Sequence, residues 1–162
     1  MLKNIVIYGA GGFGREVAWL IERINKVNPE WNVLGFVDDV KTEMYGKNIN
    51  NIKLLGGREW FKTYKEEIHV TCPIGGSKGR RSIYQSLEQY KNVKFATLID
   101  PSVSLSDTSA IGKGSIICCG SRIMINVKIG KGVVLNTGSA VGHDSELRDY
   151  CTLHTNVMVS GA

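Results

Sequence analysis

The amino-acid sequence predicts a small α/β unit with a parallel sheet, followed by a parallel β-solenoid with three-sided coils. Two observations carry this prediction. Strand and helix signals alternate over the first 100 residues. From Pro101 onwards the helical period is replaced by a six-residue period. We therefore expect two domains, residues 1–100 and residues 101–162.

The expected elements of the first domain follow from the spacing of its apolar residues. Short β-branched runs predict strands, and apolar residues three and four positions apart predict helices. In chain order we expect a strand at 3–9, a helix at 13–27, a strand at 31–39, a short helix at 57–67, a strand at 68–75, a helix at 78–91 and a strand at 93–99. This order favours a parallel sheet with right-handed crossovers.

The second domain has an aliphatic residue at every sixth position, a period that fits neither a helix nor a flat sheet. The ten positions are Leu105, Ile111, Ile117, Ile123, Ile129, Leu135, Val141, Leu147, Leu153 and Val159. We expect coils with one aliphatic side chain pointing inward from each of three sides, and a small residue near each corner. Residues 18 apart in the sequence then stack along the solenoid axis and form columns, in which successive residues are about 4.8 Å apart. The expected columns are 105, 123, 141 and 159; 111, 129 and 147; and 117, 135 and 153.

Composition bounds the function. A 162-residue chain that is 43% apolar and 22% charged is typical of a soluble globular protein, and no run approaches the roughly 18 apolar residues of a membrane span. The formal charge of +5 suits anionic small molecules, whereas no basic run is interleaved with aromatic residues, so we expect no nucleic acid partner. The apolar run within MLKNIVIYGAGG is too short for the apolar region of a signal peptide. We expect a cytoplasmic protein without membrane insertion.

The four cysteines predict free thiols. Cys72, Cys118, Cys119 and Cys151 show neither CxxC spacing nor paired histidine ligands. Buried free thiols in a reducing compartment are the expected state. No metal site is expected.

Three stretches together resemble a known family. The hexapeptide pattern resembles that of left-handed parallel β-helix acyltransferases. The opening IVIYGAGGFGREV, the following FVDD and the segment LNTGSAVGHDSELRDY narrow the likeness to sugar acetyltransferases of the bacillosamine-pathway (PglD) and sialic-acid (NeuD) types. The likeness covers essentially all 162 residues. It implies a Rossmann-like sugar-nucleotide-binding domain, a left-handed β-helix, acetyl-CoA as co-substrate and a homotrimer.

His143 and Asp144 are the expected catalytic pair. Acetyl transfer needs a base for the attacking group and a donor for the developing oxyanion. His143 stands two positions after the inward Val141, and therefore at an outward corner. The resemblance implies that His143 is the base and that Asp144 orients it. Adjacent residues of a straight strand point to opposite faces, so the contact requires a bend; Glu146 and Asp149 are the alternatives.

The resemblance also implies a coenzyme site beside this corner. Gly161 lies 18 residues after His143 and would offer its N–H to the thioester oxygen. Ser160 and His154 are the other expected cofactor contacts, His154 as a residue lining the same cleft. Lys113, Lys128 and Lys131 are expected at corners, as solvated side chains or contacts of coenzyme A phosphates. His69, inside an expected strand, is expected to be structural.

The substrate site is expected at the glycine loop. A GxGxxG pattern after a strand and before a helix can hold a phosphate with backbone N–H groups. The expected substrate-binding residues are Gly9, Gly11, Gly12, Phe13, Gly14, Asp38, Asp39, Gly75 and Gly76. Many family members have histidine where this chain has Phe13. The same loop followed by Asp38 also describes an NAD site.

The favoured function is acetyl-CoA-dependent N-acetylation of a nucleotide-linked amino sugar in surface glycan synthesis. O-acetylation of a sialic acid or another sugar, an NAD(P)-dependent oxidoreductase, a metal-dependent hydratase and a non-catalytic scaffold are the alternatives. The chain stops at Val-Ser-Gly-Ala, after about three coils, where relatives continue. We therefore expect a truncated chain with weak or no activity.

Overall fold

Strand β1 (Lys3–Tyr8) lies at the centre of a six-stranded sheet because its residues Ile5 to Ile7 are buried on both faces. The computed structural model describes all of residues 1–162. The strand order is β3-β4-β2-β1-β5-β6, and every pairing is parallel except that of β3 with β4. The helices are α1 (Gly12–Val27), α2 (Trp60–Thr63) and α3 (Ser77–Leu87), with a 3-10 turn at Thr42–Met44. The other strands of this sheet are β2 (Trp31–Val37), β3 (Asn48–Ile49), β4 (Ile52–Gly56), β5 (Ile68–Thr71) and β6 (Val93–Phe95).

Three expectations for this sheet are corrected. The hairpin of β3 and β4 occupies the stretch expected to be a polar loop, with Asn50 and Asn51 at positive φ in its turn. The helix expected at 57–67 is shortened to the single turn α2. The strand expected at 93–99 is two strands, because β7 (Leu98–Ile99) leaves the α/β sheet and pairs with β10 of the solenoid.

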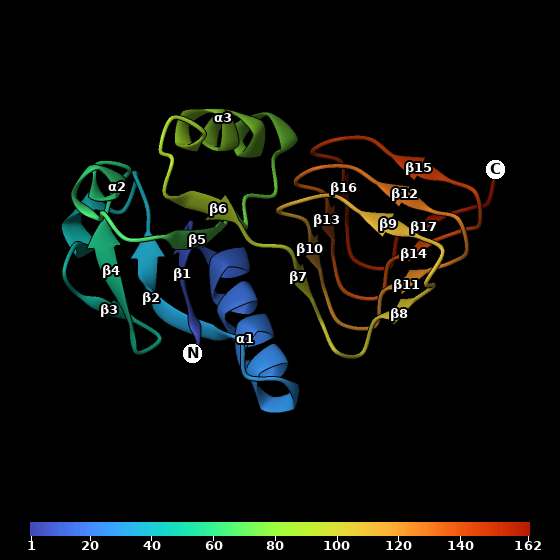
Figure 1. Cartoon of the computed structure of the whole chain (residues 1–162), viewed down its shortest axis with the longest axis horizontal. Helices are drawn as coiled ribbons and strands as arrows, with labels where there is room; N and C mark the ends of the chain where they lie inside the picture. The colour runs from blue at the N-terminus through green and yellow to red at the C-terminus, as the bar shows by residue number, and fades with distance from the viewer.

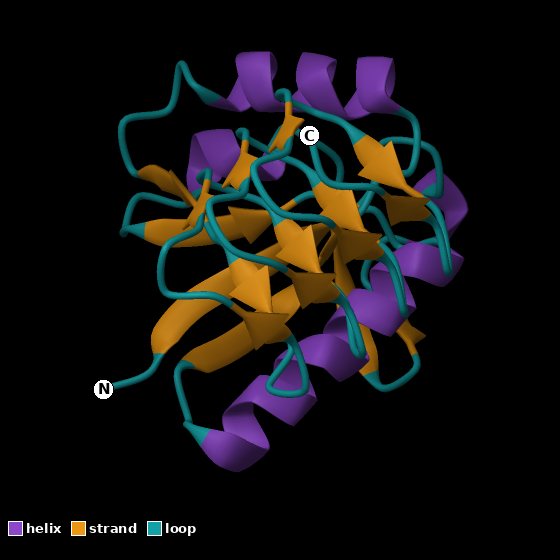
Figure 2. Cartoon of the chain, turned by 90° about the vertical axis from the view of Figure 1, so that its right-hand side faces the viewer, coloured by secondary structure: helices purple, strands orange, loops and turns teal.

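Residues 98–159 form the left-handed parallel β-helix, seen on the right of Figure 1. Three parallel sheets make its three sides: β7, β10, β13 and β16; β8, β11, β14 and β17; and β9, β12 and β15. Its strands after β7 are β8 (Ser104–Leu105), β9 (Ala110–Ile111), β10 (Ile116–Ile117), β11 (Arg122–Ile123), β12 (Lys128–Ile129), β13 (Val134–Leu135), β14 (Ala140–Val141), β15 (Glu146–Leu147), β16 (Thr152–Leu153) and β17 (Met158–Val159). Figure 2 shows these strands stacked in rows.

The expected internal columns are confirmed. Paired residues are 18 apart throughout, as in Ile117 with Leu135 and Ile123 with Val141. The period also extends one step earlier than expected, because Ile99 pairs with Ile117. The inward side chains form one apolar cluster that includes nine buried residues.

The small residues near the corners include serines that hydrogen-bond to the neighbouring coil. Ser115, Ser121, Ser139 and Ser145 are buried, and each hydroxyl donates to a carbonyl oxygen of the next coil, at 2.9 to 3.2 Å. A buried hydroxyl without a partner is costly, so this bond explains why serine is tolerated inside the coil. Side-chain bonds therefore add to the backbone ladder between successive coils.

One apolar core joins the two halves of the molecule. Leu98, Ile116 and Val134 point outward from one side of the β-helix and are completely buried against a cluster that includes Val17 and Ile21 of α1. Only two residues separate β6 from β7. The solenoid and the α/β unit therefore pack as one body (Figure 1).

An ion pair reinforces this junction. The guanidinium of Arg23, on α1, donates to both carboxylate oxygens of Asp100, at 2.6 and 3.0 Å, and the Asp100 side chain is only 1% exposed. Burial alone would raise the pKa of Asp100, but the hydrogen bonds from Arg23 and Ser102 outweigh it and hold the pKa below its usual range.

Replacing Asp100 with asparagine is expected to lower the free energy of unfolding at pH 7 by about 2 kcal/mol, because a charge-assisted bond is lost. A carboxylate whose pKa is depressed by folding stabilises above its unfolded pKa, about 3.9, and that contribution is lost as pH falls through the folded value. Urea titrations between pH 7 and 2.5 should therefore show a shallower acid decline for Asp100→Asn than for wild type. If the free energy of unfolding fell equally with pH in both proteins, the Asp100 carboxylate would not be the stabilising group.

The cysteines are free thiols and His69 lies in a strand, as the sequence predicted. All four cysteines are free; Cys72 is buried, while the other three are partly exposed, and burial raises the pKa of Cys118 to about 12. His69 lies in β5 and packs edge-on against Trp31 with ring centroids 5.2 Å apart. No helix is long and apolar enough to cross a bilayer.

Candidate active site

The backbone bends at the corner between β14 and β15, and the bend brings His143 and Asp144 together. Asp144 has a φ of 60°, in the left-handed region, so its side chain swings to the same side as its neighbour. His143 Nδ1 lies 2.9 Å from Asp144 Oδ2. Of the two alternatives, Asp149 accepts a bond from the Lys131 N–H, and Glu146 lies on β15. Asp144 is therefore the carboxylate that orients the ring.

The coil below holds Asp144 in place. Asn126, 18 residues earlier, donates its side-chain amide to Asp144 Oδ1 at 2.9 Å, and the Asp144 N–H donates to the Ile125 carbonyl at 3.0 Å. The hydrogen bond from Asn126, and then that from His143, lower the pKa of Asp144. The carboxylate is accordingly ionised at neutral pH and can accept a hydrogen bond from the Nδ1–H of His143.

Gly161 lies directly beside the imidazole. A Cβ on this glycine would come within 2.5 Å of His143 Nε2, so any other residue would displace the ring from this position. Nδ1 is bonded to Asp144, which leaves Nε2 as the nitrogen free for proton transfer. The Gly161 N–H makes no hydrogen bond within the chain. A free ring nitrogen and a free backbone donor thus stand side by side.

The remaining expected cofactor residues divide between two corners. Ser160 precedes Gly161, and its carbonyl accepts a bond from the Ser145 hydroxyl at 3.0 Å. His154 follows β16 and lies at the corner between β16 and β17. Histidines 11 residues apart fall on different corners of an 18-residue coil, so His154 does not line the cleft of His143 within one chain.

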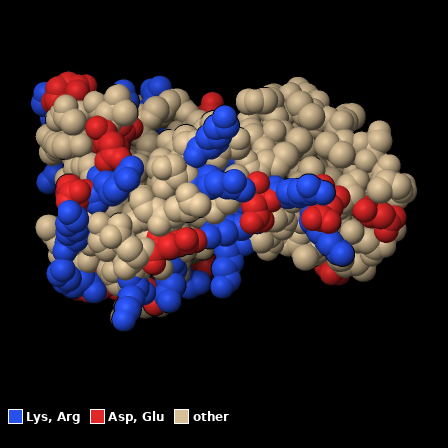
Figure 3. All heavy atoms as spheres, turned by 90° about the horizontal axis from the view of Figure 1, so that it is seen from above, with Lys and Arg blue, Asp and Glu red and all other residues tan.

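Two of the three lysines are not at free corners. Lys131 forms an ion pair with Glu88, after α3, and lies over the rings of Tyr84 and Phe95. Lys128 lies on a flat side, in β12, where it lines a hollow of about 400 Å³ with Arg81 and Arg148. Figure 3 shows charged side chains crowding over the α/β unit and its junction with the β-helix.

The glycine loop lies at the carboxyl end of β1. Gly9 has a φ of 117°, and Gly11 is the N-cap of α1. A Cβ on Gly14 would overlap the Gly9 carbonyl oxygen, so Gly14 serves the close packing of the helix on the loop. A Cβ on Gly11 or Gly12 would meet nothing within 4 Å, so these two residues border open space. Phe13 is partly buried in the core beneath.

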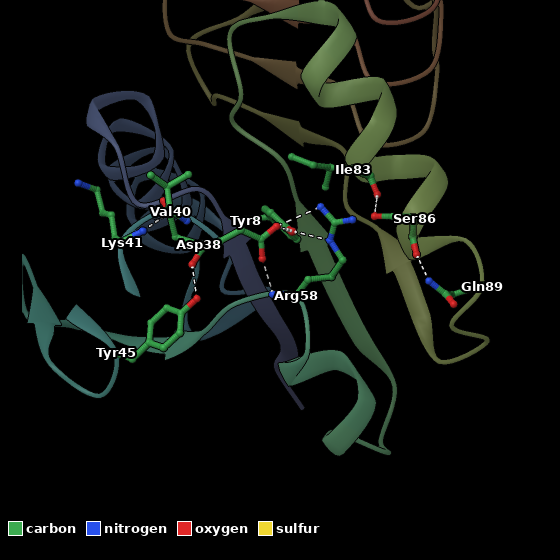
Figure 4. Close-up of polar contacts among 10 residues, drawn as sticks. Tyr8, Asp38, Val40, Lys41, Tyr45, Arg58, Ile83, Ser86 and Gln89 are labelled. Atoms are coloured by element: carbon green, nitrogen blue, oxygen red, sulfur yellow. Dashed lines mark hydrogen bonds and ion pairs between the residues drawn. The ribbon is translucent and has the colours of Figure 1, made fainter. Parts of the chain in front are cut away.

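Asp38 and Asp39 are bonded to their own chain, and Figure 4 shows Asp38 beside its partners Val40 and Lys41. Asp38 Oδ2 accepts the Ala10 N–H at 2.8 Å, and Oδ1 accepts two N–H groups of its own loop. Asp39 accepts bonds from the Tyr8 hydroxyl at 2.5 Å and from the Arg58 guanidinium at 3.0 Å. Partial burial alone would raise the pKa of Asp39, but these bonds lower it. Both carboxylates therefore shape the loops rather than stand free for a ligand.

Gly75 and Gly76 belong to the loop between β5 and α3, beside the glycine loop. The Ile74 side chain lies so close to Gly9 that a Cβ there would be 2.8 Å from Ile74 Cδ1. A Cβ on Gly75 or Gly76 would meet nothing within 4 Å. The structure thus gathers the predicted substrate glycines at the carboxyl edge of neighbouring strands, where ligands of parallel α/β sheets bind.

The two halves of the predicted site lie on different sides of the β-helix. The α/β unit packs against the side formed by β7, β10 and β13, whereas His143 lies at the corner between the other two sides. The Ala162 N–H donates to the His143 carbonyl, and the C terminus lies at the right-hand edge of Figure 1, away from the α/β unit. One chain alone does not bring its glycine loop to its own His143.

Sequence reasoning missed two buried polar residues of α3. Arg80 and Tyr84 are both completely buried, and the Tyr84 hydroxyl donates to the Gly114 carbonyl at 2.5 Å. Burial raises the pKa of Tyr84, so the hydroxyl stays a donor. Neither residue carries a local sequence signal, because both stand in an amphipathic helix whose partner is far along the chain.

Comparison with known proteins agrees with this architecture. Residues 4–87 match the domain family described as the PglD N-terminal domain. The chain is 30% identical over 156 residues to a GDP-perosamine N-acetyltransferase of Escherichia coli O157:H7, covering 96% of this chain and 69% of that protein. WeeI from Acinetobacter baumannii AYE superposes with a TM-score of 0.85 at 27% identity, covering 98% of this chain and 73% of that one. PerB from Caulobacter crescentus, solved with CoA and GDP-perosamine, superposes with a TM-score of 0.84 at 21% identity, covering 99% and 73%.

Proposed function

The chain belongs to the PglD family of sugar acetyltransferases, and from that premise we propose that it transfers the acetyl group of acetyl-CoA to the amine of a nucleotide-linked amino sugar. The observation that carries the proposal is the corner at His143, where a ring bonded to Asp144 lies beside Gly161, whose N–H makes no hydrogen bond within the chain. The curated relative's name, GDP-perosamine N-acetyltransferase, makes a GDP-linked amino sugar the first acceptor to test.

In the proposed step, His143 Nε2 removes a proton from the sugar amine as its nitrogen attacks the thioester carbonyl. The C–N bond forms and the developing oxyanion accepts a hydrogen bond from the Gly161 N–H. The C–S bond then breaks, and the imidazolium of His143 returns the proton to the departing thiolate, which releases coenzyme A as the thiol. A preorganised donor such as the Gly161 N–H stabilises charge only as it develops. Ser160 and, on the neighbouring corner, His154 are the other proposed cofactor contacts.

We divide the work between the two units. Residues 1–100 hold the nucleotide sugar through the N–H groups of Gly11, Gly12, Gly75 and Gly76, with Gly9, Gly14, Asp38 and Asp39 shaping the loops. Residues 101–162 hold acetyl-CoA. The bonds that occupy both oxygens of Asp38 count against an NAD site, because the acidic residue that would bind the ribose is already used by its own chain.

The active site is proposed to lie between copies of the chain, in a homotrimer. The glycine loop and His143 lie on different sides of one β-helix, so a sugar held by one copy would reach the histidine of its neighbour. Free thiols and an acetyl-CoA co-substrate favour the cytoplasm, and a nucleotide-linked amino sugar favours a role in surface glycan synthesis.

The test is thiol release from acetyl-CoA, measured on the chain extended to the length of its relatives. The panel of acceptors contains GDP- and UDP-linked amino sugars, their hydroxyl analogues, and free sialic acids. Turnover is expected only with the nucleotide-linked amines. If only a sialic acid supported turnover, the proposed reaction would be O-acetylation of a sugar hydroxyl and not N-acetylation. No turnover with any acceptor, together with tight binding of NADH, would favour an oxidoreductase instead.

A further inference from the structure

Arg80 is a buried cation that has no carboxylate partner. Its side chain is completely buried in α3, where arginine is rarely found unless its donors are satisfied. Burial lowers its pKa, yet a guanidinium remains charged at any physiological pH. Its acceptors are the carbonyl oxygens of Ile74, Gly75, Gly132, Tyr150 and Cys151 and the hydroxyl of Thr152.

These acceptors come from three separate parts of the chain. Nε donates to the Gly132 carbonyl at 2.7 Å, and Nη2 donates to the Tyr150 carbonyl at 2.7 Å and to Thr152 Oγ1 at 2.8 Å. Gly132 and Tyr150 are 18 residues apart, at the same corner of two successive coils. Nη1 donates to the carbonyls of Ile74 and Gly75. The guanidinium therefore joins the loop after β5 to two coils of the β-helix.

The same bonds fix the direction of two peptide groups. In a trans peptide the C=O and the following N–H point in opposite directions. Because the carbonyls of Ile74 and Gly75 face Arg80, the N–H groups of Gly75 and Gly76 face away from it. Neither N–H makes a hydrogen bond within the chain. Thr152 Oγ1 also donates to the Gly75 carbonyl at 3.1 Å and holds the second peptide in the same orientation.

We propose that Arg80 is a positioning residue for the nucleotide sugar: through Thr152 and the coils, it holds the loop 74–76 so that the N–H groups of Gly75 and Gly76 face the ligand. The inference rests on the proposed function and adds to it a residue that touches no substrate. Arginine suits this role because its planar fork supplies five donors in fixed directions, whereas lysine supplies three from one rotating nitrogen.

The main test variant is Thr152→Val, which removes one acceptor of Arg80 and the direct bond to Gly75 at nearly constant volume. Amide hydrogen exchange across residues 72–80 is expected to accelerate. The Kd of GDP or UDP, whichever the wild type binds, and the KM for the nucleotide sugar are expected to rise about three- to tenfold, as one lost hydrogen bond implies. The kcat and the KM for acetyl-CoA are expected to stay near wild type. Arg80→Lys, which keeps the charge, is expected to change the same quantities further.

Asp100→Asn is the matched control, because it weakens another polar link between the two units, the one from Arg23, without contacting the loop. If it raised the nucleotide Kd as much as Thr152→Val does, general loosening of the junction would explain the effect and the proposal would be wrong. Unchanged exchange at 72–80 in both Thr152→Val and Arg80→Lys would also overturn it. Exchange and nucleotide Kd are measured without turnover, so a wild type inactive with every acceptor would refute the proposed function separately.

Discussion

Replacing His143 with alanine is expected to lower kcat for acetyl transfer by about 100- to 10,000-fold, the usual contribution of a general base. The side chain is 59% exposed, so its loss leaves no cavity and the thermal midpoint is expected to stay within a degree or two of wild type. The measurement is steady-state thiol release with the best acceptor of the panel. Turnover near the wild-type value would show that another group takes the amine proton.

Two further variants test whether the loss of turnover is specific to His143 and the carboxylate bonded to it. Asp144→Asn keeps a residue type that tolerates the left-handed backbone but removes the charge, so we expect a smaller loss, about 10- to 100-fold. Thr137→Ala is the matched control, because Thr137 stands two positions after an inward leucine, as His143 stands after Val141. It is expected to leave kcat unchanged.

The His143 variant also tests whether the active site is shared between copies. Gly11→Asp adds a negative charge at the glycine loop, in open space and with an ordinary φ of −75°. Each variant alone is expected to be inactive. The two variants are then mixed in equal amounts, so that oligomers contain both. If the loop and the histidine of one site come from different chains, each is wild type in half of the sites. About one quarter of the sites therefore combine a wild-type loop with a wild-type histidine and recover turnover. A mixture with no recovered turnover would place both groups in one chain.

Replacing Leu135 with alanine is expected to lower the free energy of unfolding by about 2 to 5 kcal/mol, the range for a buried leucine that leaves a cavity. Leu135 is completely buried in the middle of its column, between Ile117 and Leu153. Neighbouring coils are held in register by the backbone ladder and the serine bonds, so they cannot collapse into the space. Equilibrium urea unfolding is the measurement.

Leu105 provides the control at the same position of the repeat. It lies in β8 and is 38% exposed, so Leu105→Ala is expected to cost less than about 1 kcal/mol. Equal losses for the two variants would mean that stability is not set by burial within the column.

The β-helix could be predicted in detail because its repeat depends on local sequence. One aliphatic per side is sufficient to give the columns, and the structure confirms each of them. Ile99 was missed because its apolar neighbours Ala96 and Leu98 fit a strand of the preceding sheet equally well. The hairpin of β3 and β4 did carry a signal, since Asn50-Asn51 between two isoleucines is a turn that favours positive φ.

The contact between His143 and Asp144 was predictable for a related reason. The third residue after each inward aliphatic from Ile111 to Leu153 has a positive φ, and most of these residues are glycine or asparagine. Asp144 stands at this position, so the bend that brings it to His143 follows from the repeat itself. Arg80 could not be found in this way, because its acceptors lie up to 72 residues away and give no local pattern.

The shared core of Leu98, Ile116 and Val134 with α1 has a consequence for how the chain acquires its structure. A solenoid whose repeats contact only their neighbours can begin folding at any repeat. Here one side of the first three coils is completed only when α1 is already in place. We therefore expect the α/β unit to act as the template on which the coils wind, one after another, towards the corner that carries His143. The corner that carries His143 would then form only after the coils that precede it.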